Sequence, residues 1–347
     1  MDTINRQKFI ELTGAGSMAR AVKSLTVAEI ANEGRLRAFE FGTPILVIVT
    51  LYGGNDGLNT VIPYQNPSYY ALRPSLSFQE DEVLALDADL ALNGSMTGLK
   101  ALWEKGLLGI VRGVGYPSME RSHFSSMAIW QSATLRAVQS GWIGRWLDTQ
   151  PRDEFLAINL GSILAPMLAG EQKSGSVLPL TNRRSDSRSS KLADQLDIVA
   201  ELIAAGAPTR VWSVSLGGFD THSDAKSTQS RLLGAVSDAI ANFMSQLKNT
   251  SRRRDVTVLV YSEFGRRVRA NDTDGTDHGS SSPVFLIGEK VKAGFYGEDP
   301  AFDVKSHDDL PVTTDFRDIY AEILENLLDT ESERIINKTR RSLGLFR

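Results

Sequence analysis

The most informative absence in this sequence is cysteine, of which the chain has none. Without cysteine, disulfides, thiolate metal sites and cysteine nucleophiles are all excluded. Any metal ion would be held by aspartate, glutamate, histidine, hydroxyl or water oxygen. That ligand set favours zinc, manganese, magnesium or calcium over iron–sulfur or copper(I). Because a chain of 347 residues can bury a large core without disulfides, their absence says little about the compartment.

Two further features are missing. No run of 18 apolar residues occurs, so no transmembrane helix is expected. The chain also lacks an excess of positive charge. Its net charge of -4 gives no reason to expect nucleic acid as a partner. With 41% hydrophobic and 23% charged residues, the composition is that of an ordinary globular protein.

The N-terminal segment "NRQKFIELTGAGSMARAVKSLTVAEIA" has a pattern similar to that of a twin-arginine export signal. Gln7 stands where the second arginine belongs, and Arg20 and Lys23 interrupt the apolar region. One interpretation is an amphipathic helical tail. The other is a degenerate export signal, which predicts a periplasmic or exported protein and leaves a cytoplasmic location open.

Apolar, β-branched runs alternate with stretches of helical periodicity. This alternation predicts an α/β fold, with a mostly parallel central sheet flanked by helices on both faces. We expect a leader-like segment over residues 1–42 and one α/β domain over 43–347, interrupted by a polar, serine-rich excursion at 170–195. The predicted strands are 43–54, 106–115, 155–161, 209–218, 255–265 and 282–288. The predicted helices include 122–137, 229–249 and 314–328, the last capped by Thr314.

Polar, glycine-rich motifs stand beside these strands: "GGNDGLNT", "MERSHF", "GGFDTHSD", "SEFGRR" and "GTDHG". In open α/β sheets, ligands bind at the carboxyl ends of the strands, so we expect these motifs to meet there. Each motif also has a plain structural interpretation, as an Asx turn, a helix N-cap or a buried ion pair. The candidate metal ligands are Asp56, Asp220, His222, Glu263, Asp277 and His278. The candidate catalytic residues are Ser122 and Arg121, and the candidate substrate-binding residues are Asn55, His123 and Arg266. His307, in "VKSHDDL", has no neighbouring glycines and no predicted strand before it, so we do not include it among the candidate site residues.

Taken in order, these motifs, together with "GWIGRW" and "LPVTTDFRDIY", resemble domain-of-unknown-function family 1501, a twin-arginine-associated family. That family is placed in the alkaline phosphatase-like superfamily, with sulfatases, phosphodiesterases and cofactor-independent phosphoglycerate mutases. The likeness runs from about residue 44 to residue 346. The resemblance implies a sheet flanked by helices, with two divalent ions at the strand ends.

Residue by residue, the resemblance implies that Asp56 opens the metal site and that Ser122 stands near the nucleophile position. Asp220 and His222 match ligands of the first ion, and His278 matches the late histidine ligand, with Asp277 as an extra candidate. Glu263 falls where relatives carry an Asp-His pair, but the next residue here is Phe264. This departure removes one nitrogen ligand from the second metal position.

Two functions from different classes follow. The first is a metal-dependent hydrolase of a phosphate or sulfate ester, using one or two divalent ions on a small or polymeric anionic substrate. Ser122 or a water molecule would attack, and Arg121 and Arg266 would hold the substrate's oxygens. The second is a non-catalytic protein that binds a metal, an anion or a glycan on the same scaffold.

Overall fold

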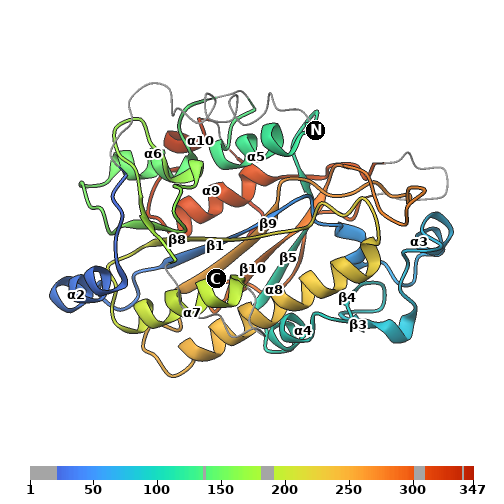
Figure 1. Cartoon of the computed structure of the whole chain (residues 1–347), viewed down its shortest axis with the longest axis horizontal. Coiled ribbons are helices and arrows are strands. Elements are labelled where there is room, and N and C mark those ends of the chain that lie inside the picture. The colour runs from blue at the N-terminus through green and yellow to red at the C-terminus, as the bar shows by residue number, and fades with distance from the viewer. Residues whose placement is uncertain (1–21, 136–137, 181–190, 301–308, 338–339) are drawn as a thin grey trace.

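The computed structural model describes residues 22–135, 138–180, 191–300, 309–337 and 340–347. Its central feature is a nine-stranded sheet with the strand order β11-β5-β10-β9-β1-β8-β6-β7, to which β12 is added beside β5 (Figure 1). The six predicted strands are present as β1 (Ile45–Tyr52), β5 (Leu108–Gly115), β6 (Ala157–Leu160), β8 (Val211–Gly217), β9 (Val256–Ser262) and β10 (Ser282–Gly288). Shorter strands at its edges are β7 (Ser176–Leu178), β11 (Gly294–Tyr296) and β12 (Thr314–Asp315).

The sheet is mostly parallel, as predicted. Strand β1 pairs in parallel with β8 and β9, and β6 pairs in parallel with β7 and β8. Strand β10 is the exception, because it runs antiparallel to both β5 and β9. The segment between β9 and β10 therefore returns to the same edge of the sheet at which β9 ends.

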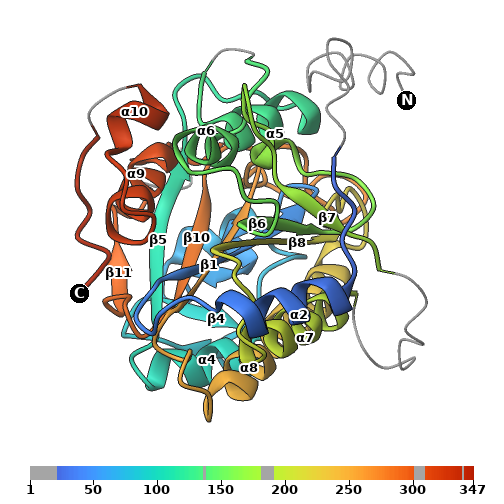
Figure 2. The same ribbon diagram turned by 90° about the vertical axis from the view of Figure 1, so that its left-hand side faces the viewer.

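Helices cover both faces of the sheet (Figures 1 and 2). One face carries α5 (His123–Ser132), α6 (Trp142–Thr149), α9 (Phe316–Asn326) and α10 (Ser332–Ile336). The other carries α4 (Thr97–Glu104), α7 (Lys191–Ala204) and α8 (Ala225–Leu247). These layers confirm the predicted α/β architecture.

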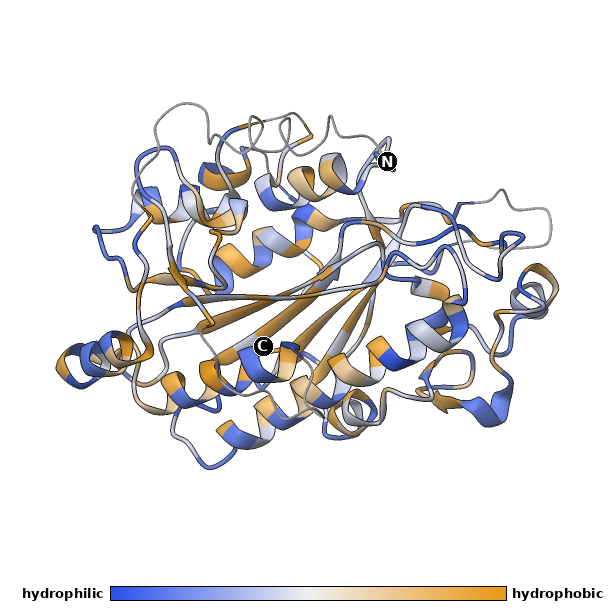
Figure 3. Cartoon of the chain, viewed as in Figure 1, coloured by the Kyte–Doolittle hydropathy of each residue, from blue (hydrophilic) through white to orange (hydrophobic). Residues whose placement is uncertain are grey.

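Two hydrophobic cores separate the layers, and the strands between them are coloured almost continuously apolar in Figure 3. Alternate residues of β1 belong to opposite cores: Val47 and Val49 face α7 and α8, whereas Leu46 and Ile48 face α5 and α9. A strand buried on both sides needs apolar residues at every position, which explains the unbroken run "ILVIV".

A small three-stranded sheet lies outside the main one and combines β2 (Val61–Ile62), β3 (Val83–Ala85) and β4 (Ala91–Asn93). Beside it are α3 (Pro67–Leu72) and the short 3-10 helices η1 (Gly57–Asn59) and η2 (Glu80–Glu82); a third, η3 (Pro166–Leu168), precedes β7. This subdomain follows β1 and forms one wall of a cavity described below.

Three sequence expectations need comment. Helix α9 is capped by Asp315, whose side chain accepts the Arg317 N–H, whereas Thr314 pairs with β5 as part of β12. The polar excursion at 170–195 contains the buried edge strand β7 and the start of α7, while residues 181–190 lie outside the described residues. His307 also lies outside them.

The described part of the predicted leader-like segment forms helix α2 (Val27–Arg37). Thr26 and Glu29 make a reciprocal capping box, and Ile30 is buried at the periphery against the main body. Residues 1–21 are outside the described part of the chain, so the leader and the domain boundary at residue 43 stay predictions. Within the described residues, no helix combines the length and the apolar character that crossing a membrane requires.

Candidate metal centre

Three side chains from separate segments converge at the carboxyl edge of the parallel strands. His123 is the first residue of α5, Asp220 follows β8, and His278 lies between β9 and β10. Their ligand atoms all lie within 4.8 Å of one another. Asp220 Oδ1 is 3.3 Å from His123 Nε2 and 3.2 Å from His278 Nε2.

Hydrogen bonds on the far side of each ring fix which nitrogen faces the cluster. His123 Nδ1 lies 2.7 Å from Glu263 Oε1, and His278 Nδ1 lies 2.7 Å from the Arg121 carbonyl oxygen. A carboxylate and a carbonyl only accept hydrogen bonds, so both imidazoles donate through Nδ1. In the neutral rings, both Nε2 atoms therefore present lone pairs to the cluster.

Electrostatics keep these groups in the forms that bind metals. Burial lowers the pKa of His278, which favours the neutral imidazole near pH 7. Burial alone would raise the pKa of Asp220. The hydrogen bond and charge of Arg266 outweigh that effect and lower the pKa of Asp220 to about 2. The carboxylate is thus ionised, and the Nε2 lone pair of the neutral His278 ring faces an oxygen that is itself an acceptor.

The geometry fits a tetrahedrally coordinated ion. Ligands bound to zinc at about 2.0–2.1 Å lie roughly 3.3 Å apart, close to the separations found between Asp220 Oδ1 and the two imidazoles. His123 Nε2 is buried and has no hydrogen-bond partner among the described residues. A buried acceptor without a donor is costly unless a cation sits in front of it.

His222 lies beside this cluster as a candidate fourth ligand. Its Nε2 is 3.0 Å from Asp220 Oδ1 and 3.1 Å from His278 Nε2. Its Nδ1 is 3.4 Å from Asp277 Oδ1, so Asp277 faces the outer side of His222. Both side chains are about half exposed, and their positions are less constrained than those of His123 and His278.

Glu263 stands behind His123 rather than within the cluster. Its carboxylate accepts the Gly53 N–H, the Ser262 hydroxyl and the His123 Nδ1–H, and the residue is 1% exposed. A carboxylate that holds the far nitrogen of a ligating histidine fixes the ring and raises its basicity. The predicted ligand is therefore better described as the residue that orients one.

Glu263→Gln is expected to weaken zinc binding by about 10–100-fold, because the amide no longer stabilises the His123 Nδ1–H as a charged acceptor does. Competition titration against a chromophoric chelator measures this loss. The matched control is Glu331→Gln, an exposed residue just before α10 that makes no contact with the cluster. This variant is expected to bind zinc normally. Unchanged zinc affinity in Glu263→Gln would contradict the orienting role.

Asp56 and Asn55 lie after β1 but turn away from the cluster. The Asp56 carboxylate forms a 2.7 Å ion pair with Arg73, and both side chains are buried. Asn55 exchanges hydrogen bonds with Thr60 and accepts one from Gln229. Because these contacts hold both side chains inside the protein, we include neither among the proposed ligands or substrate contacts.

Arg266 does not reach a substrate either. Its guanidinium is 2% exposed, lies 2.7 Å from Asp220 Oδ1, and donates to four backbone carbonyls. Those carbonyls belong to Gly53, Gly54, Phe219 and Thr276. Arg266 thus holds the loop after β1 against the loop after β8. From the sequence, Arg266 was a candidate anion-binding residue.

Arg121 and Ser122 precede the first ligand. The Arg121 side chain pairs with Asp309 and is 49% exposed, so it remains accessible to a substrate anion. Ser122 occupies the N-cap position of α5, but its hydroxyl makes no capping hydrogen bond. Both residues are exposed and directly precede His123.

Phe264 stands where relatives carry a histidine ligand, but in this structure its side chain packs against the cluster. It is 0% exposed, and its ring centroid lies 4.8 Å from that of His123 and 5.0 Å from that of His278. The ring supports both imidazoles from behind. A histidine in place of Phe264 would therefore disturb the packing of the other two rings.

Gly53 is a positioning residue that sequence reasoning missed. Its φ of +119° is unfavourable for other residues, and a Cβ atom there would lie 2.4 Å from the Asp220 nitrogen. Only glycine lets the end of β1 approach the loop that carries Asp220. The "GG" after an apolar strand was the available signal.

The fold and this cluster define an α/β protein with a candidate metal centre at the carboxyl edge of its sheet. The chain belongs to the family described as "Protein of unknown function (DUF1501)", whose profile matches residues 167–343. Family membership is as the motifs predicted. No curated protein matches this sequence.

Three solved structures illustrate the similarity of fold. A protein in the alkaline phosphatase superfamily from Vibrio parahaemolyticus is 12% identical with a TM-score of 0.48, covering 98% of this chain and 80% of that one. The C-terminal periplasmic domain of EcEptC from Escherichia coli, in complex with zinc, is 13% identical with a TM-score of 0.42, covering 73% and 75%. Murine ectonucleotide pyrophosphatase/phosphodiesterase 5 is 11% identical with a TM-score of 0.42, covering 86% and 97%.

Proposed function

We propose that this protein is a metal-dependent hydrolase of a phosphate or sulfate ester. The observation that carries the metal site is the convergence of His123 Nε2, His278 Nε2 and Asp220 Oδ1 on one point. Imidazole and carboxylate together favour zinc over calcium or magnesium, and this one cluster fits one ion. The ester class rests on the resemblance of the motifs to alkaline phosphatase-like enzymes.

A bound zinc ion would act as a Lewis acid and lower the pKa of a nucleophile beside it. The chain's own residues supply orientation. Glu263 and the Arg121 carbonyl hold the two imidazoles, and Arg266 holds Asp220. Ser122 offers a hydroxyl next to His123 as nucleophile, and the exposed Arg121 side chain offers a cation for the substrate's oxygens.

Ser122→Ala is expected to lower turnover of a phosphate or sulfate ester by at least about 1,000-fold while the zinc content stays unchanged. Turnover is measured in a screen of both ester classes, with elemental analysis on the same samples. Ser125→Ala, three residues further along α5, is the matched control. A substantial residual rate in Ser122→Ala would assign the attack to water instead.

Metal removal tests the hydrolase proposal as a whole. Dialysis against EDTA is expected to abolish turnover, and added zinc is expected to restore it. If the protein binds zinc but cleaves no ester when metal is supplied, the hydrolase proposal is contradicted.

The second candidate is a non-catalytic metal-, anion- or glycan-binding protein, and one observation favours it. Of the two predicted anion-binding arginines, Arg266 is engaged by contacts inside the protein, and Arg121 alone of the two remains exposed to a substrate anion. Zinc binding that tightens the affinity for a sulfated glycan, without turnover, would support this candidate. Export to the periplasm remains a prediction for either function.

A further inference from the structure

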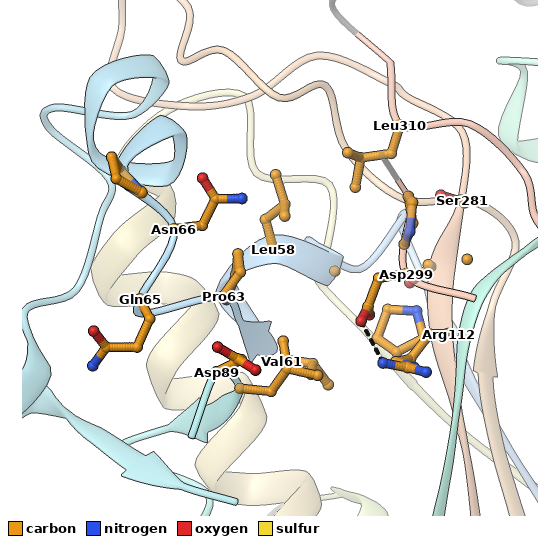
Figure 4. Close-up of a pocket in the computed structure, with 17 residues that line it drawn as sticks. Leu58, Val61, Pro63, Gln65, Asn66, Asp89, Arg112, Ser281, Asp299 and Leu310 are labelled. Atoms are coloured by element: carbon orange, nitrogen blue, oxygen red, sulfur yellow. Dashed lines mark hydrogen bonds and ion pairs between the residues drawn. The ribbon is translucent and has the colours of Figure 1, made fainter. Parts of the chain in front are cut away.

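A cavity of about 550 Å³ lies at the same edge of the sheet as the candidate metal centre. Figure 4 shows the residues that line it. Its walls come from the subdomain after β1, from the end of β5 and from the segment that enters β10. This volume lies within the range of sites that bind small molecules, roughly 300–1,000 Å³. None of the cluster residues lines it.

The cavity and the candidate metal centre have no residue in common. Ser281 lines the cavity and stands three residues after His278, so their Cα atoms are at most roughly 11 Å apart. The Ser280 hydroxyl donates to the carbonyl of Leu310, which also lines the cavity. The cavity is therefore a neighbour of the metal centre and not an extension of it.

The lining selects for an aliphatic ligand. Leu58, Val61, Pro63 and Leu90 supply branched or cyclic aliphatic surface. Among the described residues that line the cavity, none is aromatic. Sugar rings and nucleobases are held in proteins largely by stacking on aromatic faces, and the described lining offers no such face.

The charges select for a cation. Arg112 pairs with Asp299 and donates to the Gly297 carbonyl at 2.8 Å, so its charge is already matched. Figure 4 shows Asp89 at the other side of the view, with its carboxylate beside Val61. No ion pair to Asp89 exists within the described part of the chain, which leaves one excess negative charge among the described residues that line the cavity.

We propose that this cavity is a second ligand site, which binds a molecule with an aliphatic body and an ammonium head. The aliphatic body lies on Leu58, Val61, Pro63 and Leu90, and the ammonium group pairs with Asp89. The site does not depend on the bound metal, nor on the proposed hydrolase activity.

Isothermal titration of the full chain with decylamine, decanol and decanoate, each below its aggregation concentration, tests the proposal. Decylamine is expected to bind at least about tenfold more tightly than decanoate, since one close charge pair is worth on the order of a tenfold change. Removing zinc with EDTA is expected to leave this preference unchanged. Equal binding of the three probes, or no binding, would overturn the proposal.

Two variants locate the binding. Asp89→Lys, at an exposed position, is expected to reverse the preference between decylamine and decanoate, whereas Asp81→Lys, exposed but outside the cavity, is expected to retain it. Val61→Phe adds a ring at the aliphatic wall of the cavity and is expected to weaken binding of all three probes. If Val61→Phe does not fold, Asp89→Lys decides alone, and an unchanged preference in that variant refutes the site.

Discussion

His278→Ala is expected to remove tightly bound zinc and esterase activity together. The imidazole presents its Nε2 lone pair to Asp220 and His123, and its orientation is set by the Arg121 carbonyl. A methyl group cannot replace that ligand. Because losing an outer partner of a metal ligand already costs about 10–100-fold in affinity, losing the ligand itself is expected to cost more than about 100-fold. Zinc content after dialysis and competition titration measure the loss.

Two comparisons make the His278 result specific. His222→Ala is expected to weaken zinc binding less, because His222 is half exposed and its outer nitrogen lies 3.4 Å from Asp277. Chemical unfolding of the metal-free proteins is expected to give similar midpoints for His278→Ala and the unsubstituted chain. Full zinc occupancy in His278→Ala would refute the proposed metal centre.

Arg266→Ala is expected to destabilise the fold by about 3–5 kcal/mol, because it leaves a carboxylate and several buried carbonyls without their donor. The guanidinium joins Asp220 to the ends of β1 and β8, and the residue is 2% exposed. Urea unfolding monitored by circular dichroism measures the free energy of unfolding. The variant is also expected to lose zinc, since Asp220 is no longer held.

The matched control for Arg266 is Arg269→Ala, an exposed arginine three residues further on. It is expected to change the free energy of unfolding by less than about 0.5 kcal/mol. Arg266→Lys is expected to behave like the alanine variant, because an ammonium group lacks the planar fork that reaches several acceptors. A stable Arg266→Lys protein with normal zinc binding would contradict this role of Arg266.

The candidate site was predictable in its parts but not in its roles. Polar motifs beside strands predicted Asp220, His222 and His278 as candidate ligands, and the structure brings all three together. His123 was assigned to the substrate and instead faces the cluster. Its ring is turned by Glu263, 140 residues away, and a sequence motif carries no information about that pairing.

Asp56 is the opposite case, because the sequence predicted it as a metal ligand and the structure does not place it in the cluster. Its motif, position after β1 and family resemblance all indicated a metal ligand. The structure instead pairs it with Arg73, a buried side chain that also donates to the backbone carbonyls of residues 267 and 268. The choice between an ion pair and a metal site depends on which cation the fold brings within reach.

The sequence by itself determined the family and the layered α/β architecture. Apolar runs such as that of β1 must be buried on both faces, and helical periodicity supplies the covering layers. These are local properties, set by side-chain spacing along the chain, and the strands fall close to where the runs predicted them.

Only the tertiary structure decided which polar side chains meet. The decisive feature is the reversal of β10, which runs antiparallel to β9 and β5. In a wholly parallel sheet, the segment before β10 would lie at the opposite edge, away from Asp220. With β10 reversed, His278 returns to the edge at which β8 and β9 end. Strand direction depends on non-local pairing, and the pattern of residues within a strand is the same in either direction.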